Sequence, residues 1–302
     1  MSALLRVVGL GMLLCALAAC GGAPAPTATP VPPTATSAPA SAPTATAPTA
    51  TAPTATAALA SPTPAPAAQI AVVTVGIDPA FEPFVFTRDG KLAGFDVDLL
   101  NAMAAAGDFE VAYVVAPFDE VLDGLQSGKF DAAISAITVT EERKTLVDFT
   151  APYFEIGKAP VSFYNPGQGV AIRTDNTTIT GTESLVAGVR VGVKRGTTGA
   201  AFVAEKTTAE IVEFADSPAA IQSLAAGEVD AVIVDIPVIV DYIKRNPSAG
   251  IRVTGGPVTE EAYAIAVSKA KPAVLELLDA ALVKVRESGA YDQIYNRWFG
   301  AP

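Results

Sequence analysis

Four polar or charged stretches in this 302-residue sequence each follow directly after a short apolar run that is typical of a β-strand. They are Asp78, residues 135–138 (Ser-Ala-Ile-Thr), Lys194 with Arg195, and Asp235. Open α/β sheets bind ligands just outside the carboxyl ends of their strands. Carboxylates, cations and hydroxyls gathered at such an edge can hold a small polar molecule by ion pairs and hydrogen bonds. The sequence therefore predicts a cleft that binds a small polar ligand.

The composition excludes several kinds of site. The chain has no His, so it has neither a His-based catalytic triad nor His-ligated zinc. Its two Cys residues, Cys15 and Cys20, lie well before the first predicted strand. The formal net charge of −11 argues against a nucleic-acid partner. Residues 192–198 lack the spacing of a nucleotide-binding P-loop, so we expect no catalytic residue, no metal and no cofactor.

The first 69 residues are predicted to comprise a signal peptide that directs export and a linker that follows it. An apolar run after one Arg is typical of a secretory signal peptide, here residues 1–19. The sequence Leu-Ala-Ala-Cys at its end resembles the bacterial lipobox, which implies lipidation of Cys20; the alternative is an ordinary signal peptide with a chance Cys. Residues 20–69 are rich in Pro, Thr and Ala and carry no charge, which indicates a disordered or semi-rigid linker. The expected location is the outer face of the cytoplasmic membrane, extracellular or periplasmic.

The remaining residues alternate short β-branched runs with helical patterns, which indicates an α/β fold. The pattern occurs twice, because residues 121–135 and 220–234 share the spacing Leu-x-x-Gly-x-apolar-Asp-Ala. We therefore expect two related lobes. The predicted strands are 71–77, 111–115, 130–137, 190–193, 211–214, 229–234 and 263–267, and the predicted helices are 95–106, 119–126, 198–205, 217–226, 291–299 and one that starts at 272.

Two long stretches carry a family resemblance. The first is Gly76-Ile-Asp-Pro-Ala-Phe-Glu-Pro-Phe84 followed by Gly90-Lys-Leu-Ala-Gly-Phe-Asp-Val-Asp-Leu99. The second is FDEVLDGLQSGKFDAAIS at 118–135, with TVTEER at 138–143 and VDFTAPY at 147–153. Together with matches at 191–199, 230–235 and 291–300, these stretches resemble the polar amino-acid-binding proteins of ABC importers, extracellular solute-binding family 3.

The resemblance implies a two-lobed clamp of the type II periplasmic-binding-protein kind, joined by two hinge strands. Lobe 1 would comprise residues 70–160 and 262–302, and lobe 2 residues 161–261, with chain crossings near 159–164 and 262–266. The ligand would dock in the open cleft, and the lobes would close by hinge motion. An ABC permease would then recognise the closed form, and the protein is expected to act as a monomer.

The resemblance also implies roles for individual residues. Arg143 would grip the ligand α-carboxylate through its guanidinium fork, which Lys cannot do. Asp235 would take the α-ammonium from the other lobe. Thr138 and Thr198 match positions that donate hydroxyl or backbone N–H groups to the carboxylate, and Ser135 matches one that accepts from the ammonium.

Four further residues would surround the ligand side chain. Phe81 and Phe118 match an aromatic pair that sandwiches the ligand, and Asp78 and Lys194 match positions near its side chain. If both charges face the cleft, an amide side chain such as that of glutamine is favoured. A basic side chain is favoured instead if Lys194 points out, and an acidic one if Arg195 points in.

The leading hypothesis is an extracytoplasmic receptor that captures a polar α-amino acid and delivers it to an ABC importer without turnover. The second hypothesis is an enzyme on the same scaffold, similar to cyclohexadienyl or arogenate dehydratases, and it needs a positioned general acid. The third is a sensor domain, which would need a partner to transmit its signal because the sequence predicts no spanning helix.

Overall fold

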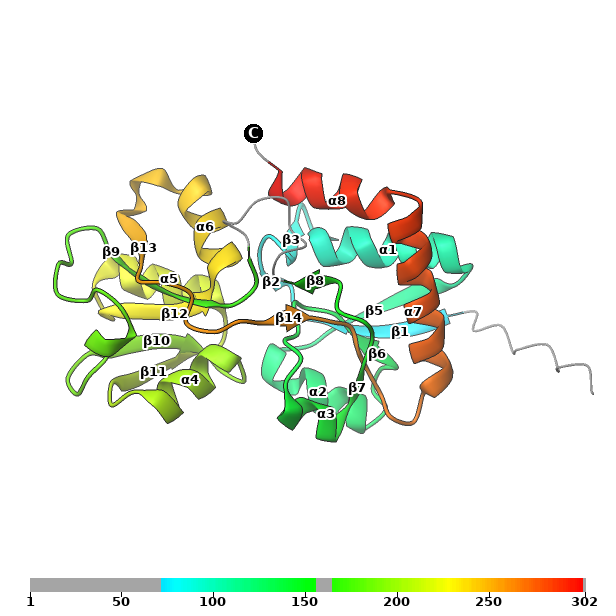
Figure 1. The fold of residues 1–302 in the computed structure, drawn as a ribbon, viewed down its shortest axis with the longest axis horizontal. Helices are drawn as coiled ribbons and strands as arrows, with labels where there is room; N and C mark the ends of the chain where they lie inside the picture. Colours follow the sequence, from blue (N-terminus) through cyan, green and yellow to red (C-terminus); the bar gives the residue numbers. More distant parts are fainter. Residues whose placement is uncertain (1–71, 156–164, 301–302) are drawn as a thin grey trace, which may run out of the picture. The chain divides into compact units, whose positions relative to one another are not determined.

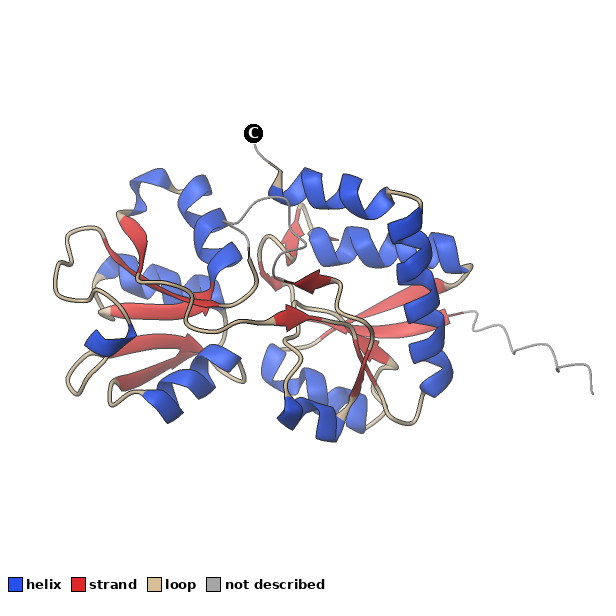
Figure 2. Ribbon diagram, in the orientation of Figure 1, coloured by secondary structure: helices blue, strands red, loops and turns tan. Residues whose placement is uncertain are grey.

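The computed structural model describes residues 72–155 and 165–300 (Figure 1). The predicted signal peptide, Cys20 and the linker at 20–69 lie outside these residues, and so does the predicted chain crossing at 159–164. In the part of the chain that is described, no helix has the length and apolar composition needed to cross a membrane. Helices alternate with strands in both halves, as predicted for an α/β fold (Figure 2).

The first five-stranded sheet defines what we call lobe 1. Its strands, in order, are β5 (Glu110–Val115), β1 (Val72–Ile77), β6 (Ala132–Ala133), β15 (Ala266–Val267) and β7 (Asp148–Phe149). β1 runs parallel to both of its neighbours, whereas β15 pairs antiparallel with β6 and β7. The strand nearest the C-terminus therefore completes a sheet that the N-terminal half begins.

Helices from both ends of the chain pack on lobe 1. α1 (Phe95–Gly107) contacts α7 (Pro272–Glu287) and α8 (Ala290–Phe299), which are coloured orange and red in Figure 1. The indole Nε1 of Trp298 donates a hydrogen bond of 2.9 Å to Asp98 on α1, so this Trp has a structural role. Two shorter helices, α2 (Phe118–Gln126) and α3 (Glu141–Leu146), also pack against each other.

A small antiparallel sheet was not predicted from the sequence. Its strands are β2 (Ala80–Phe81), β3 (Val85–Arg88) and β4 (Lys91–Ala93), each two to four residues long. Such short runs give no clear alternation of apolar and polar residues. The sheet is held to the core by Phe84, whose ring meets that of Phe154 edge-on at 5.2 Å.

The second five-stranded sheet defines lobe 2. Its strands, in order, are β11 (Glu210–Phe214), β10 (Arg190–Lys194), β12 (Ala231–Asp235), β9 (Gln168–Arg173) and β13 (Ile251–Thr254). β10 is parallel to β11 and β12, and β9 is antiparallel to β12 and β13. The helices that pack against this sheet are α4 (Thr198–Lys206), α5 (Ser217–Ala226) and α6 (Ile236–Arg245).

The two lobes repeat one arrangement around β1 and β10. Asp131, directly before β6, accepts a hydrogen bond of 3.0 Å from the backbone N–H of Thr74 on β1. Asp230, directly before β12, accepts one of 2.9 Å from the N–H of Arg190 on β10. In both lobes the strand after this Asp runs parallel to that neighbour, β6 to β1 and β12 to β10. The Asp-Ala sequence shared by the two halves therefore marks a structural repeat.

Two strand predictions were wrong in extent. The strand predicted at 130–137 is reduced to β6, because the chain turns at Ala136, which has a left-handed φ of 47°. The strand predicted at 263–267 is two strands in different sheets, since β14 (Ala262–Tyr263) pairs with β8 (Phe154–Glu155) and β15 pairs within lobe 1. Both interruptions lie where the chain passes the site described next.

Candidate functional site

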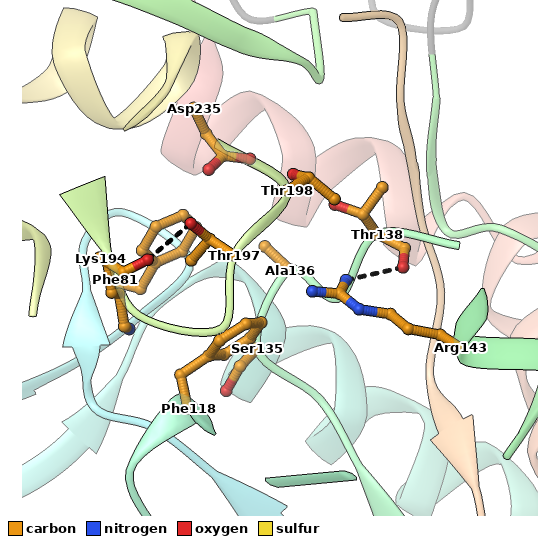
Figure 3. Close-up of a pocket in the computed structure, with 10 residues that line it drawn as sticks. All are labelled: Phe81, Phe118, Ser135, Ala136, Thr138, Arg143, Lys194, Thr197, Thr198 and Asp235. Carbon is orange, nitrogen blue, oxygen red and sulfur yellow. Dashed lines mark hydrogen bonds between the residues drawn. The ribbon is translucent and has the colours of Figure 1, made fainter. Parts of the chain in front are cut away.

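A narrow pocket lies at the carboxyl ends of β6, β10 and β12 (Figure 3). Eight of the nine residues predicted to bind a ligand line it, and the ninth, Asp78, contacts the lining residue Lys194. A wider groove adjoins the pocket and shares lining residues with it. The residues that line the pocket are Phe81, Phe118, Ser135, Ala136, Thr138, Arg143, Lys194, Thr197, Thr198 and Asp235.

Lys194 and Asp78 form a buried ion pair beside this pocket. Lys194 is the last residue of β10 and Asp78 follows β1, and their side chains are only 3% and 8% exposed. The Lys194 ammonium also lies 5.3 Å from the ring centroid of Phe81 and 5.0 Å from that of Phe118, within the range of cation–π attraction. The backbone N–H of Asp78 donates to the Ser135 hydroxyl at 2.9 Å. Both charges therefore face inward.

Arg195 points away from the pocket. Its Nε donates to Asp119 on α2 at 3.2 Å, and its side chain is 48% exposed. Adjacent residues at the end of a strand point to opposite sides, so only one of Lys194 and Arg195 can face the pocket. Of the alternatives left open by the sequence, the structure supports an inward Lys194 and an outward Arg195.

Arg143 is buried although it belongs to a short helix. Thr140 caps α3 by accepting from the Arg143 backbone N–H at 3.1 Å, which fixes where the helix begins. The guanidinium donates to two backbone carbonyls, from Nη1 to Thr138 at 2.8 Å and from Nη2 to Gly196 of lobe 2 at 3.0 Å. These bonds use two of its five N–H donors. Burial lowers the pKa of Arg143, and the charges of Glu261 and Asp235 oppose that shift.

The N-terminus of α4 borders the same pocket. Thr197 caps this helix by accepting from the Ala200 N–H at 3.2 Å, and its own hydroxyl donates to the Lys194 carbonyl at 2.7 Å. Thr198 is the first helical residue. The first N–H groups of a helix have no partner within it, so this end suits an anionic group.

Asp235 is a buried carboxyl at the end of β12, where it also precedes α6. It accepts a hydrogen bond from the hydroxyl of Tyr263 on β14. Burial, together with the negative charge of Glu261, raises the pKa of Asp235 to about 7. This carboxyl would become fully ionised when a cationic group is placed beside it.

Several residues near the pocket were missed by the sequence analysis. Thr197 and Ala136 line it, and Glu261 and Gln168 bond to the lining threonines. Thr197 could have been found, because a Thr before a helix is a common cap. Glu261 carries no comparable signal, since the exposed Glu260 beside it is the same residue type.

The comparisons with known proteins agree with this architecture. Residues 73–301 match the family model of the bacterial extracellular solute-binding proteins, family 3. The chain belongs to this family. It is 37% identical over 241 residues to a probable histidine-binding protein of Neisseria gonorrhoeae, covering 78% of this chain and 86% of that protein.

Two further relatives illustrate the range of the family. The ABC transporter glutamine-binding protein GlnH of Bacillus subtilis is 33% identical, over 69% of this chain and 73% of its own length. The structure of an ancestral arginine-binding protein bound to glutamine superposes with a TM-score of 0.69 at 37% identity, covering 77% of this chain and all of that one. The two-lobed fold expected from the sequence is thereby confirmed.

Proposed function

We propose that this protein captures one polar α-amino acid between its lobes and delivers it, chemically unchanged, to an ABC importer. The observation that carries the proposal is a small pocket with opposite buried charges from both lobes, Arg143 of α3 and Asp235 of β12. A free α-amino acid is a zwitterion and needs both charges. The names of the relatives, which include histidine- and glutamine-binding proteins, support the same class of ligand.

In the proposed pose, the α-carboxylate and α-ammonium of the ligand bind to charged and polar groups of both lobes. The α-carboxylate takes the remaining donors of Arg143 and the free N–H groups at the start of α4. The α-ammonium lies against Asp235, with Ser135 as a further acceptor. The side chain then extends past Phe81 and Phe118, which line the pocket, and ends beside the Lys194–Asp78 pair.

A neutral amide side chain fits that end of the pocket best. The Lys194 ammonium can donate to the amide oxygen, while the Asp78 carboxylate can accept from the amide NH₂. An arginine or lysine ligand would have to displace the Lys194 ammonium from between the two aromatic rings. The carboxylate of an acidic ligand would be repelled by the Asp78 carboxylate. Arg195 would not offset this repulsion, because it is paired with Asp119. We therefore propose glutamine as the ligand.

The proposal extends to the parts of the chain outside the described residues. The mature protein would begin at Cys20, whose lipid would anchor it, and residues 20–69 would tether the two lobes at the outer face of the membrane. Lobe 1 would comprise 70–160 and 262–302, lobe 2 would comprise 161–261, and the permease would bind the closed monomer. The protein would not act as an enzyme, in keeping with relatives that are named as binding proteins.

A thermal-shift screen against the twenty amino acids tests this function. A ligand that binds only the folded state raises the melting temperature, by an amount that grows with its concentration over Kd. We expect glutamine to give the largest rise. A flat response to all twenty would contradict the proposal. Product formation from a prephenate-like carboxylate, tested by a direct assay, would favour the dehydratase alternative.

A further inference from the structure

Glu261 holds hydroxyl groups from three segments with one carboxylate. Its Oε2 accepts from Thr138 of lobe 1 at 2.7 Å, and its Oε1 accepts from Thr198 of lobe 2 at 2.7 Å and from Thr259 at 2.9 Å. Glu261 precedes β14 and is 8% exposed, and it does not line the pocket itself. Its hydrogen bonds therefore connect it to the ligand site through Thr138 and Thr198.

These bonds decide what the two threonines can offer to a ligand. A hydroxyl has one proton and two lone pairs. Since Thr138 and Thr198 both give their proton to Glu261, each hydroxyl can only accept from the pocket. Thr198 also accepts from Gln168 Nε2 at 3.1 Å, which leaves it one lone pair.

We propose that Glu261 is a positioning residue that fixes the hydroxyls of Thr138 and Thr198 as hydrogen-bond acceptors towards the ligand. The proposal rests on the amino-acid-binding function proposed above and deepens it. The two hydroxyls are then placed to accept from the α-ammonium, whose three N–H donors they share with Asp235 and Ser135. The α-carboxylate receives its hydrogen bonds from Arg143 and the start of α4 alone. The sequence led us to expect that these threonines donate hydroxyl or backbone N–H groups to the carboxylate. In this proposal only backbone N–H groups can do so, because both hydroxyl protons go to Glu261.

The charge of Glu261 supplies a second effect on the same site. Asp235 faces Tyr263 of β14, Gln168 of β9, Arg143 of α3 and Glu261 itself. Within this set, Glu261 is the neighbour whose charge raises the pKa of Asp235, whereas the hydrogen bonds of Tyr263 and Gln168 lower it. Neutralising Glu261 should therefore lower the pKa of Asp235, which a purely structural residue would not do.

The test uses Glu261→Gln, which keeps the side-chain shape. Because Oε1 serves two hydroxyls, the new amide nitrogen is expected in the place of Oε2, beside Thr138. Thr138 must then accept from that nitrogen, and its proton turns towards the pocket. We expect the affinity for L-glutamine to fall on the order of tenfold by calorimetry, since an acceptor facing the ligand is lost. Thr138→Val should add little further loss in this background.

The matched control is Glu260→Gln at the exposed neighbouring position, which should bind glutamine as the wild type does. Glu261→Asp is the second variant, because it keeps the charge but is too short to reach all three hydroxyls. It should lose affinity while the pKa of Asp235 stays raised. Unchanged glutamine affinity in Glu261→Gln, with the wild type binding, would overturn the inference.

A measurement without ligand separates this inference from the proposed function. The titration of Asp235, followed by ¹³C NMR in the ligand-free full chain, should move to lower pH in Glu261→Gln and remain in place in Glu260→Gln. If the wild type binds no amino acid, the proposed function fails, and the titration still decides the role of Glu261. An Asp235 pKa that is the same in both variants would overturn the inference.

Discussion

Lys194 of lobe 2 lies in a direct buried ion pair with Asp78 of lobe 1, and its ammonium lies between two aromatic rings. Each group satisfies the charge of the other, so neither can be removed without leaving a buried charge unpaired. The pair also sets the polarity of the pocket at the end that would meet a ligand side chain. It therefore offers a direct way to change ligand preference.

Lys194→Met should shift the preference towards basic amino acids. The variant removes the ammonium that pairs with Asp78 and contacts Phe81 and Phe118. The place it leaves suits the guanidinium or ammonium of a ligand. We expect glutamine affinity to fall about tenfold or more and arginine affinity to rise, both measured by calorimetry. Loss of both ligands together would argue that Lys194 supports the fold rather than the choice of ligand.

Arg195→Ala is the control for that prediction. Arg195 is next in the sequence, but its partner Asp119 is on the outside and both side chains are partly exposed. Exposed ion pairs contribute about 0–1 kcal/mol. Glutamine affinity should therefore change by less than about fivefold.

Arg143→Ala should abolish strong binding. The variant leaves the ligand carboxylate in a buried site without its cation, which costs about 2–5 kcal/mol. Arg143→Lys should also bind weakly, because an ammonium cannot replace the guanidinium fork. Lys144→Ala, at the exposed next position on α3, should bind normally in the same titration. Normal binding by Arg143→Ala would refute its assignment to the carboxylate.

Binding should weaken as the pH falls through 7. Burial, with the charge of Glu261, raises the pKa of Asp235 to about 7, so this carboxyl is increasingly protonated below that pH. The α-ammonium needs the ionised form, and each pH unit below 7 should cost up to about tenfold in affinity. The affinity should level off above pH 7. Asp235→Asn should bind weakly with no such pH dependence, and a flat wild-type profile would count against the assigned role.

Asp96 predicts a separate pH effect, on folding. It is fully buried and accepts from the Ala136 N–H at 2.8 Å, and burial raises its pKa to about 7. An Asp in the unfolded chain has a pKa of about 3.9, so the folded state binds the extra proton between these values. The free energy of unfolding should then decrease as the pH rises from about 4 to 7, by up to about 1.4 kcal/mol per unit.

Asp96→Asn isolates this contribution. Asparagine can still accept from the Ala136 N–H, but it does not titrate. Denaturant unfolding at several pH values should show a smaller slope in the variant, with part of the slope retained because Asp235 acts in the same direction. An identical slope in the two proteins would show that Asp96 does not titrate as its burial indicates.

The charged residues at the strand ends could be predicted because local pattern determines them. An apolar β-branched run marks a strand, and the next polar residue must then lie at its carboxyl end, as Asp78, Lys194 and Asp235 do. The alternation along a strand also places neighbouring side chains on opposite sides. The pattern did not decide which of Lys194 and Arg195 faces inward. A short apolar run does not show which face of the sheet the residues at its end point to.

The role of Glu261 could not be predicted, because it depends on distant partners. Its hydroxyl donors Thr138 and Thr198 are 123 and 63 residues away in the sequence. β6 also ends early because of a distant partner. Ala136 has a left-handed backbone conformation, and its N–H donates to the carboxylate of Asp96, 40 residues earlier in the sequence. Contacts of this kind appear only once the two sheets are assembled.

Isothermal titration of the purified protein with L-glutamine shows whether the protein captures this amino acid and leaves it unchanged. We expect saturable binding of one glutamine per chain, with all of the amino acid recovered unchanged when the protein is denatured afterwards. Failure of glutamine to bind at concentrations where a basic or an acidic amino acid saturates the protein would contradict the assigned ligand. Absence of saturable binding by any amino acid would contradict the function itself.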